Sequence, residues 1–272
     1  MKRWFSSNNG LLLLLSTMFS ASCNATDTKH VVVYPKYSQR SEFYAQVLNL
    51  ALQKTANEYG SFELHPFERE VSTERLRRYL KLNQHIDVLW SSSNKQRDRQ
   101  LRAVRFDLLK GLSQYRFLLI KKGQHTRFST INKLEDLRYF TAGSGTYWSD
   151  TQILKYNGIP TISSVNDSLL PMLAAGRFDY VSRGSYEVWS ELNAYKGQFD
   201  ILKHVVLHYP TRYFFYVNPD NTLLAERLEK GLYMALADGS FDQLFFSVAD
   251  FQQGWDKLIE LENSTTISLQ VP

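Results

Sequence analysis

Short apolar runs typical of β-strands alternate along the chain with segments in which apolar residues recur at helical spacing. Residues His30–Pro35 form a β-branched run that ends in proline, which predicts a strand. From Ser41 onward the apolar residues Phe43, Val47 and Leu50 return at helical spacing, and Gly60 ends that helix. Further strands are expected at residues 61–67, 86–90, 115–120, 139–142, 161–165, 180–182, 201–207 and 213–217, with helices between them. Strands that alternate with helices in this way predict an α/β protein with mostly parallel pairing.

The last third of the chain is expected to be mainly helical. Residues 222–238 place Leu224, Leu228 and Leu232 on one face, and Gly239 follows the helix. Residues 241–261 also read as mostly helix. The remaining tail from Asn263 is polar, and we expect it to be loose.

The first 25 residues have the pattern of a secretory signal. Lys2 and Arg3 come first, an apolar stretch follows, and small residues lead up to Ala25. The apolar stretch is too short to span a bilayer, which needs roughly 20 such residues. We therefore expect an exported, periplasmic protein. Cys23, the only cysteine, is either removed by cleavage after Ala25 or is a lipid acceptor, and we favour simple cleavage.

Composition and charge narrow the possible partners. The 272 residues are 43% hydrophobic, which is enough apolar material for two modest lobes or for one large domain. The formal net charge of +5 is too small, taken alone, to indicate nucleic acid as a partner. The most basic segment, residues 94–105, has no aromatic residue for base stacking between its cations. For most of that segment a solvated helix face is the better interpretation.

A strand end near residue 183 supplies the first candidate site. The predicted strand at residues 180–182 is followed by Arg183 and Glu187, at the carboxyl end of the strand where open α/β sheets bind ligands. The fork of an arginine pairs with carboxylate or phosphate through two hydrogen bonds, so Arg183 is a candidate anion clamp. The alternative is a surface arginine that caps the strand.

Two further strand ends carry small polar residues. Gly143, Ser144, Gly145 and Thr146 stand between a predicted strand and a helix, where free N–H groups favour an anion. Trp148 occupies the place of the third glycine of a dinucleotide fingerprint, so that motif is excluded. A plain tight turn, with Trp148 in the core, explains the segment equally well.

Hydroxyl groups also follow the predicted strand that ends at Trp90. Ser91, Ser92 and Ser93 stand there, and Arg97 and Arg116 are near in sequence. A simple serine turn is the alternative.

No pattern in the chain indicates catalysis or a bound cofactor. The sequence contains no nucleophile elbow and no zinc motif, and its six histidines are scattered. Glu187 and Glu191 share a helix face, but two carboxylates one turn apart are usually a solvated pair. We therefore expect no catalytic residue, no metal and no cofactor.

Together these motifs resemble type II periplasmic solute-binding proteins, the group whose best-known members bind amino acids (solute-binding family 3). The resemblance covers roughly residues 30–250 and implies a two-lobed fold in which each lobe is a mixed, mostly parallel sheet flanked by helices. Hinge strands would lie near residues 116–121 and 205–210. The first lobe would comprise residues 26–119 and 208–262, the second residues 120–207, with a C-terminal tail at 263–272. The resemblance to this family rests on four stretches of the sequence: residues 87–90 with Ser92 and Arg97, residues 115–118, residues 143–146, and residues 176–180 continuing to Glu191.

The resemblance also assigns roles to residues. In amino-acid binders a serine followed five residues later by arginine holds the ligand carboxylate, which implies Ser92 and Arg97, and the turn of the second lobe corresponds to Ser144, Gly145 and Thr146. This chain has Gly184 where those proteins usually carry an aspartate for the ligand ammonium, unless Glu187 replaces it. The full set of expected ligand contacts is Tyr34, Trp90, Ser92, Arg97, Arg116, Ser144, Gly145, Thr146, Trp148, Arg183 and Glu187.

These expectations give a function and two rivals. The chain would be a monomer that traps a small polar ligand, anionic or amino-acid-like, and passes it to an ABC transporter or a sensor in the membrane. The arginines favour an anion. The rivals are a dehydratase-like periplasmic enzyme with Glu187 as general acid or base, and a signalling or structural relative whose cleft no longer binds. Nucleic acid is not an expected partner.

Overall fold

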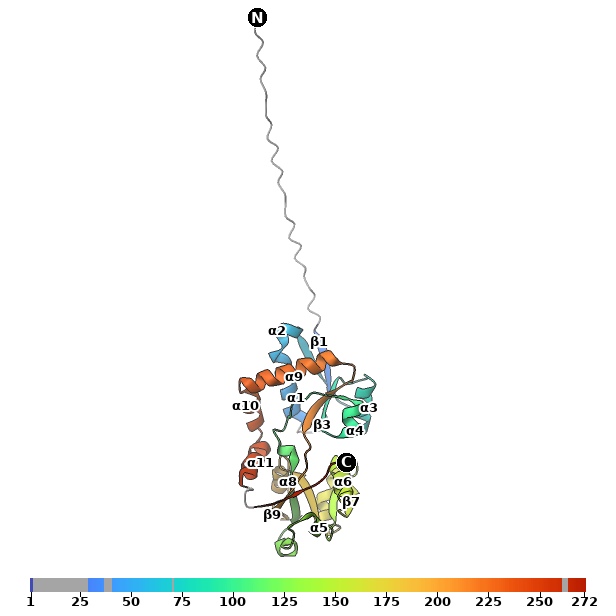
Figure 1. Ribbon diagram of the computed structural model, residues 1–272, viewed down its shortest axis with the longest axis vertical. Helices are drawn as coiled ribbons and strands as arrows, with labels where there is room; N and C mark the ends of the chain where they lie inside the picture. Colours follow the sequence, from blue (N-terminus) through green and yellow to red (C-terminus); the bar gives the residue numbers. More distant parts are fainter. Residues whose placement is uncertain (2–28, 37–40, 70, 261–263) are drawn as a thin grey trace.

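The computed structural model describes residues 1, 29–36, 41–69, 71–260 and 264–272. Apart from Met1, the predicted signal segment with Cys23 lies outside these residues. Within the described part of the chain, no helix is long and apolar enough to cross a membrane. Figure 1 shows the described elements gathered into two bodies, which we call the first lobe (around α1, α9 and β3) and the second lobe (around β9, α6 and α8).

The first lobe is built from two separate stretches of the chain, one before and one after the second-lobe sheet strands β5 to β9. Strand β10 (Tyr213–Val217) lies between β3 (Val88–Ser92) and β4 (Arg102–Ala103) and pairs antiparallel with both. A separate parallel pair joins β1 (His30–Pro35) to β2 (Phe62–Phe67). The helices are α1 (Ser41–Lys54), α2 (Ala56–Tyr59), α3 (Thr73–Lys81), α4 (Lys95–Gln100), α9 (Thr222–Ala237) and α10 (Ser240–Phe246).

Close packing of α1 on α9 organises the core of this lobe. The buried face of α1 includes Val47, Leu48 and Ala51, and it meets the buried face of α9 around Leu228. Gly231 lies at the contact, where an added Cβ would stand 2.0 Å from the Ala51 carbonyl oxygen. The absent side chain lets the helix backbones approach, and each fully buried leucine stabilises the lobe by roughly 1.5–3 kcal/mol.

The second lobe is a six-stranded mixed sheet in the order β11-β9-β5-β8-β6-β7. Its centre, β5 (Tyr115–Lys121), pairs antiparallel with β8 (Tyr180–Gly184) and β9 (Phe199–His208). Along β5, Phe117 and Leu119 enter one core and Leu118 and Ile120 another, so both faces of the sheet are covered. The other elements are α5 (Leu134–Leu137), β6 (Ala142–Gly145), α6 (Ser149–Tyr156), β7 (Thr161–Ser164), α7 (Asn166–Ala174), α8 (Val188–Ala194) and β11 (Thr265–Ser268), with 3₁₀ turns η1 (Leu112–Gln114) and η2 (His125–Phe128).

Two sequence predictions about this lobe were wrong. The strand expected at residues 139–142 is β6, so Gly143 and Gly145 belong to a strand and not to a turn. These glycines serve packing, because a Cβ on Gly143 would stand 2.3 Å from the Phe178 ring. The loose tail expected from residue 263 is also wrong over residues 264–272. There β11 pairs parallel with β9, and Ile267 and Leu269 are buried.

The chain crosses between the lobes beside η1. Strand β5 lies wholly in the second lobe's sheet, so the first crossing comes earlier than the hinge expected near residues 116–121. The chain returns after β9 through residues 209–212. Ser113 Oγ donates to the Thr211 carbonyl (2.8 Å), and Thr211 Oγ1 donates to the Ser113 carbonyl (3.1 Å), so the two crossings are tied together.

Helix α11 makes a third link between the lobes. It spans Ala249–Ile259 and packs against α8 and η1. Gly254 faces the loop before α8, where an added Cβ would stand 2.2 Å from the Ser185 carbonyl oxygen. The same carbonyl accepts a hydrogen bond from Trp189 Nε1 at 2.7 Å.

Candidate functional site

A cleft of about 380 Å³ lies between the lobes, within the usual size range of small-ligand sites. Six of the residues expected from the sequence line it: Trp90, Ser92, Arg97, Arg116, Trp148 and Glu187. The other five, Tyr34, Ser144, Gly145, Thr146 and Arg183, do not. The cleft also takes in residues that sequence reasoning did not select, among them Tyr44, Arg77, Ser149, Asp150, Tyr186, Glu191 and Tyr213.

Arg97, on the first-lobe wall of the cleft, is a buried arginine. It sits in the first turn of α4, where its backbone N–H donates to the capping Asn94 Oδ1 at 2.7 Å. The residue is only 5% exposed, and its Nε and Nη1 atoms are buried without a hydrogen-bond partner among the residues that the structure describes. Burial and the nearby charge of Arg77 lower the pKa of this guanidinium. Since an unpaired buried cation is costly, the site is suited to an anionic group from a ligand.

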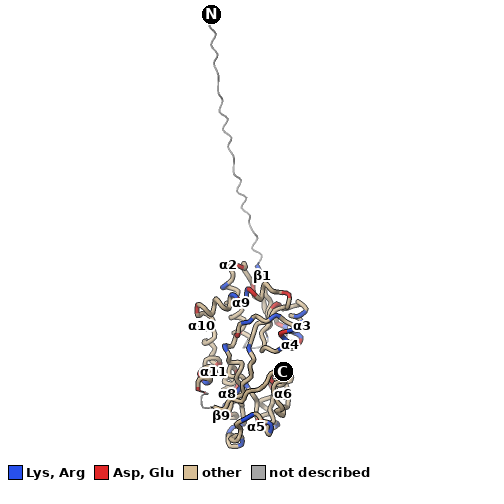
Figure 2. Tube along the Cα trace, in the orientation of Figure 1, with Lys and Arg blue, Asp and Glu red and all other residues tan. Residues whose placement is uncertain are grey.

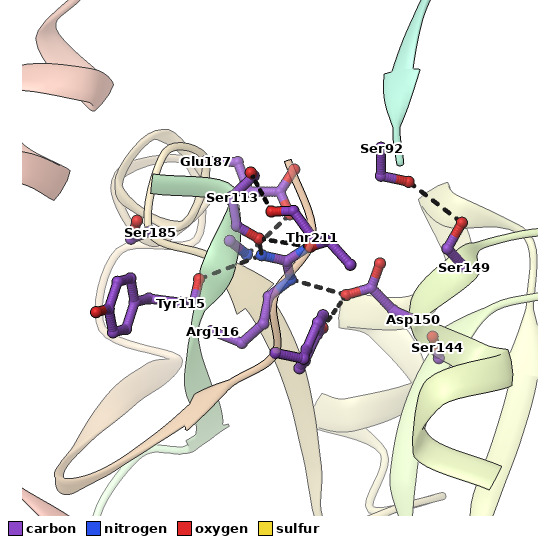
Figure 3. Close-up of polar contacts among 12 residues, drawn as sticks. Ser92, Ser113, Tyr115, Arg116, Ser144, Ser149, Asp150, Ser185, Glu187 and Thr211 are labelled. Atoms are coloured by element: carbon purple, nitrogen blue, oxygen red, sulfur yellow. Dashed lines mark hydrogen bonds and ion pairs between the residues drawn. The ribbon is translucent and has the colours of Figure 1, made fainter. Parts of the chain in front are cut away.

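Ser92 stands at the end of β3 and reaches across the cleft. Its Oγ donates to Ser149 Oγ, at the first residue of α6 in the second lobe, over 3.2 Å (Figure 3). The end of β3 and the start of α6 therefore face each other at close range. Both hydroxyls border the same cleft as Arg97.

Aromatic rings form the floor beside Ser92. Tyr44 stacks on Trp90 with ring centroids 5.0 Å apart and on Tyr213 at 5.4 Å. Tyr44 comes from α1 and Tyr213 from β10, so no local pattern could have grouped them with Trp90. Tyr34, expected as a cleft wall, lines a different groove together with Glu42 and Leu64.

Arg116 is neutralised inside the protein, contrary to its predicted role as an anion clamp. Its Nε contacts Asp150 Oδ1 at 2.7 Å, and Nη1 donates to the Ser113 carbonyl at 2.5 Å (Figure 3). The Tyr209 hydroxyl donates to the same carboxylate, and the Tyr209 ring lies 4.9 Å from the guanidinium. Burial raises the pKa of the Asp150 carboxyl, but the charge of Arg116 and the hydrogen bonds from Arg116 and Tyr209 together outweigh burial and hold that pKa below its usual range.

Arg183 is also paired, and it lies behind the cleft. Strand β8 continues to Gly184, so Arg183 is inside the strand and only 2% exposed. Its Nε contacts Glu191 Oε2 at 2.7 Å, and its guanidinium lies 4.7 Å from the centre of the Trp148 ring. The sequence predicted that Arg183 follows the strand as an anion clamp in the cleft, but the strand is longer than its apolar run, so Arg183 lies within it and does not line the cleft. Arg183 instead supports two residues that do line the cleft.

The segment from Ser144 to Thr146 likewise supports the cleft from outside. Ser144 Oγ accepts from Thr151 Oγ1 at 2.7 Å, and Thr146 lines a neighbouring groove. A Cβ on Gly145 would stand 2.3 Å from the Trp148 indole. The glycine therefore allows Trp148 to lie against the backbone, which accounts for the motif without an anion at this turn.

The second-lobe wall is acidic. Glu187, Glu191 and Asp150 line it, and Glu187 Oε1 accepts from the Gly184 N–H at 3.0 Å. The first-lobe wall opposite carries Arg77 and Arg97. Apart from Arg116, which lines the second-lobe side and is paired with Asp150, the cleft presents cations on the first-lobe wall and carboxylates on the second-lobe wall. This arrangement fits a ligand with both charges.

Comparison with known proteins supports the architecture. No protein-family model matches the sequence, and no curated protein matches it. An ancestral arginine-binding protein bound to arginine is similar in structure, with a TM-score of 0.60, 18% identity, and coverage of 81% of this chain and 98% of that chain. The substrate-binding protein of an amino acid ABC transporter is similar with a TM-score of 0.58, 15% identity, and coverage of 80% and 98%.

The GluR0 ligand-binding core from Nostoc punctiforme in complex with L-glutamate is a third similar structure. It has a TM-score of 0.59, 14% identity, and coverage of 81% of this chain and 99% of that chain. These likenesses span both lobes and confirm the fold expected from the sequence. The chain has the two-lobed type II periplasmic-binding-protein fold, with a cleft between its lobes.

Proposed function

We propose that this chain is a periplasmic solute-binding protein that closes its lobes on one amino-acid-like solute for transport or sensing. The observation that carries the proposal is Arg97, whose buried guanidinium has no partner on Nε or Nη1 among the described residues. It lines the cleft together with Ser92. A ligand carboxylate there would accept hydrogen bonds from both residues. Three solved structures of the same fold are named as binding proteins or ligand-binding cores.

The opposite wall favours an amino acid over a simple anion. Because Asp150 compensates Arg116 and Glu191 compensates Arg183, two of the three arginines expected to attract an anion are already paired. Glu187 also lines the acidic wall, three residues after Gly184, which stands where the resemblance leads us to expect an aspartate. A ligand ammonium near Glu187 and a ligand carboxylate near Arg97 would match both walls.

The experiment is a calorimetric titration of the exported protein with the common amino acids, run on matched variants. Arg97→Gln should weaken binding at least about 30-fold, since loss of one partner of a buried charge pair costs about 2 kcal/mol or more. The thermal midpoint of the ligand-free variant should not fall, because the substitution removes an unpaired buried cation.

The control is Arg99→Gln, which removes an equal charge from an exposed position of the same helix outside the cleft. It should bind like the unmodified protein. Equal binding by Arg97→Gln, or no binding of any amino acid by the unmodified protein, would overturn the proposal. Recovery of the bound amino acid unchanged would distinguish binding from catalysis.

A further inference from the structure

A second groove continues the cleft along the junction of the lobes. It measures about 710 Å³ and runs between α3, α4 and the segment Thr146–Tyr147. Thr73, Arg77, Arg97 and Tyr147 line both spaces, so the groove and the cleft adjoin at these four residues. One wall comes from the first lobe and the other from the second.

The groove is strongly basic. Its lining includes Arg75, Arg77, Arg78 and Lys81 of α3 and only one carboxylate, Glu74. None of these four cations forms an ion pair with another residue that the structure describes. Figure 2 shows the Lys and Arg positions along α3 and α4 beside the junction. By contrast, the cleft proper holds arginines and carboxylates on facing walls.

Arg77 lines both the cleft and the groove. Its partial burial is not what a fully solvated helix face predicts. Arg75, Arg78 and Lys81 are exposed, as expected of such a face, but Arg77 is half-buried. Its charge is close enough to Arg97 to lower the pKa of the Arg97 guanidinium, together with burial. Two neighbouring cations with restricted access to water repel each other, and a ligand with more than one anionic group relieves that repulsion.

We infer, on the basis of the proposed function, that the ligand is an amino acid with an acidic extension, and that Arg77 receives the anionic group of that extension in the groove. The amino-acid head would occupy the cleft between Arg97 and Glu187. The extension would leave past Arg77 and Tyr147 toward the cations of α3. An acidic dipeptide joined through a side-chain amide has this form. The head would fill the cleft and the extension the adjoining groove, with Arg77 at the boundary that the two spaces share.

The test compares two probes that share a head group. L-Glutamine carries the amino-acid head and a side-chain amide, while γ-L-glutamyl-L-glutamate adds carboxylates beyond the same amide. Calorimetric titration at low salt should show the dipeptide binding about tenfold or more tighter than glutamine, corresponding to one added charge-assisted contact. The advantage should shrink as salt is added, because the groove is open to solvent.

Variants locate the effect. Arg77→Gln should reduce dipeptide affinity about tenfold more than it reduces glutamine affinity, while Arg99→Gln, outside both spaces, should change neither affinity. If glutamine binds but the dipeptide binds no tighter, or if Arg77→Gln weakens both probes equally, the inference is overturned and the proposed function stands. If no amino acid or dipeptide binds, both are overturned.

Discussion

Replacing Asp150 by asparagine should markedly lower the free energy of unfolding, because it breaks the buried Arg116–Asp150 ion pair. The side chains of Arg116 and Asp150 are 4% and 19% exposed, so solvent screens the pair little. Replacing the carboxylate by an amide leaves the Arg116 guanidinium buried without a counter-charge. Removing one partner of a buried pair costs about 3–5 kcal/mol, and we expect about 3 kcal/mol because the amide oxygen still accepts from Tyr209.

The free energy of unfolding is measured on ligand-free protein by urea titration, followed by far-ultraviolet circular dichroism. For a chain of this size a loss of 3 kcal/mol corresponds to a fall in thermal midpoint of roughly 6–12 °C. The control is Glu260→Gln, which breaks the exposed Lys257–Glu260 pair and should cost less than about 1 kcal/mol.

A double variant isolates the unpaired charge as the cause. Arg116→Met combined with Asp150→Leu should be more stable than Asp150→Asn alone, since no buried charge then lacks a partner. A loss below about 1 kcal/mol in Asp150→Asn would refute the reasoning. So would a double variant that is less stable than the single one.

Three further predictions concern the same region. Arg183→Ala should destabilise the ligand-free protein by about 3 kcal/mol or more, because Glu191 loses its ion-pair partner and Trp148 loses the guanidinium that lies against its ring. Urea unfolding measures this loss, and an unchanged midpoint would favour the anion clamp expected from the sequence over a structural role. Gly254→Ala should cost about 1–3 kcal/mol by forcing α11 away from Ser185, as urea unfolding would measure. Gln253→Ala, at the neighbouring exposed position of the same helix, is the control and should change stability by less than about 0.5 kcal/mol. The pKa of the Asp150 carboxyl is lower in the folded than in the unfolded protein, so the ionised carboxylate stabilises the fold above about pH 4, and this stabilisation is lost as the pH falls further. In a series of urea titrations, the free energy of unfolding should therefore fall less steeply with decreasing pH in Asp150→Asn than in the unmodified protein. Equal pH dependence of the two proteins would contradict the assignment.

Local sequence features predicted much of the fold. Ser72 has the residue type of a helix cap and stands between the strands expected at residues 61–67 and 86–90, and its hydroxyl accepts from the Arg75 N–H at the start of α3. The apolar run at residues 115–120 correctly predicted strand β5, and the apolar residues at helical spacing in residues 222–238 correctly predicted helix α9. Both predictions depend only on the local spacing of buried residues along the chain. Ser92 and Arg97 reach one cleft because only a turn separates β3 from α4.

The partners of the charged residues could not be predicted in the same way. Arg116 and Asp150 are 34 residues apart, and the sheet and helix between them decide that they meet. Arg183 and Glu191 are separated by only eight residues, yet their pairing depends on where β8 ends and α8 begins. A count of arginines near strand ends therefore overestimates the positive charge that the cleft offers to a ligand.

Two tryptophans in the cleft lining are intrinsic fluorescent reporters of this site. Trp90 comes from the first-lobe wall and Trp148 from the second, and both border the space between the lobes. Indole emission responds to the polarity and charge around the ring, and Trp148 already lies against the Arg183 guanidinium. Entry of a solute should therefore change the intrinsic fluorescence of the unlabelled protein, and replacing each indole by phenylalanine in turn would report how each wall responds.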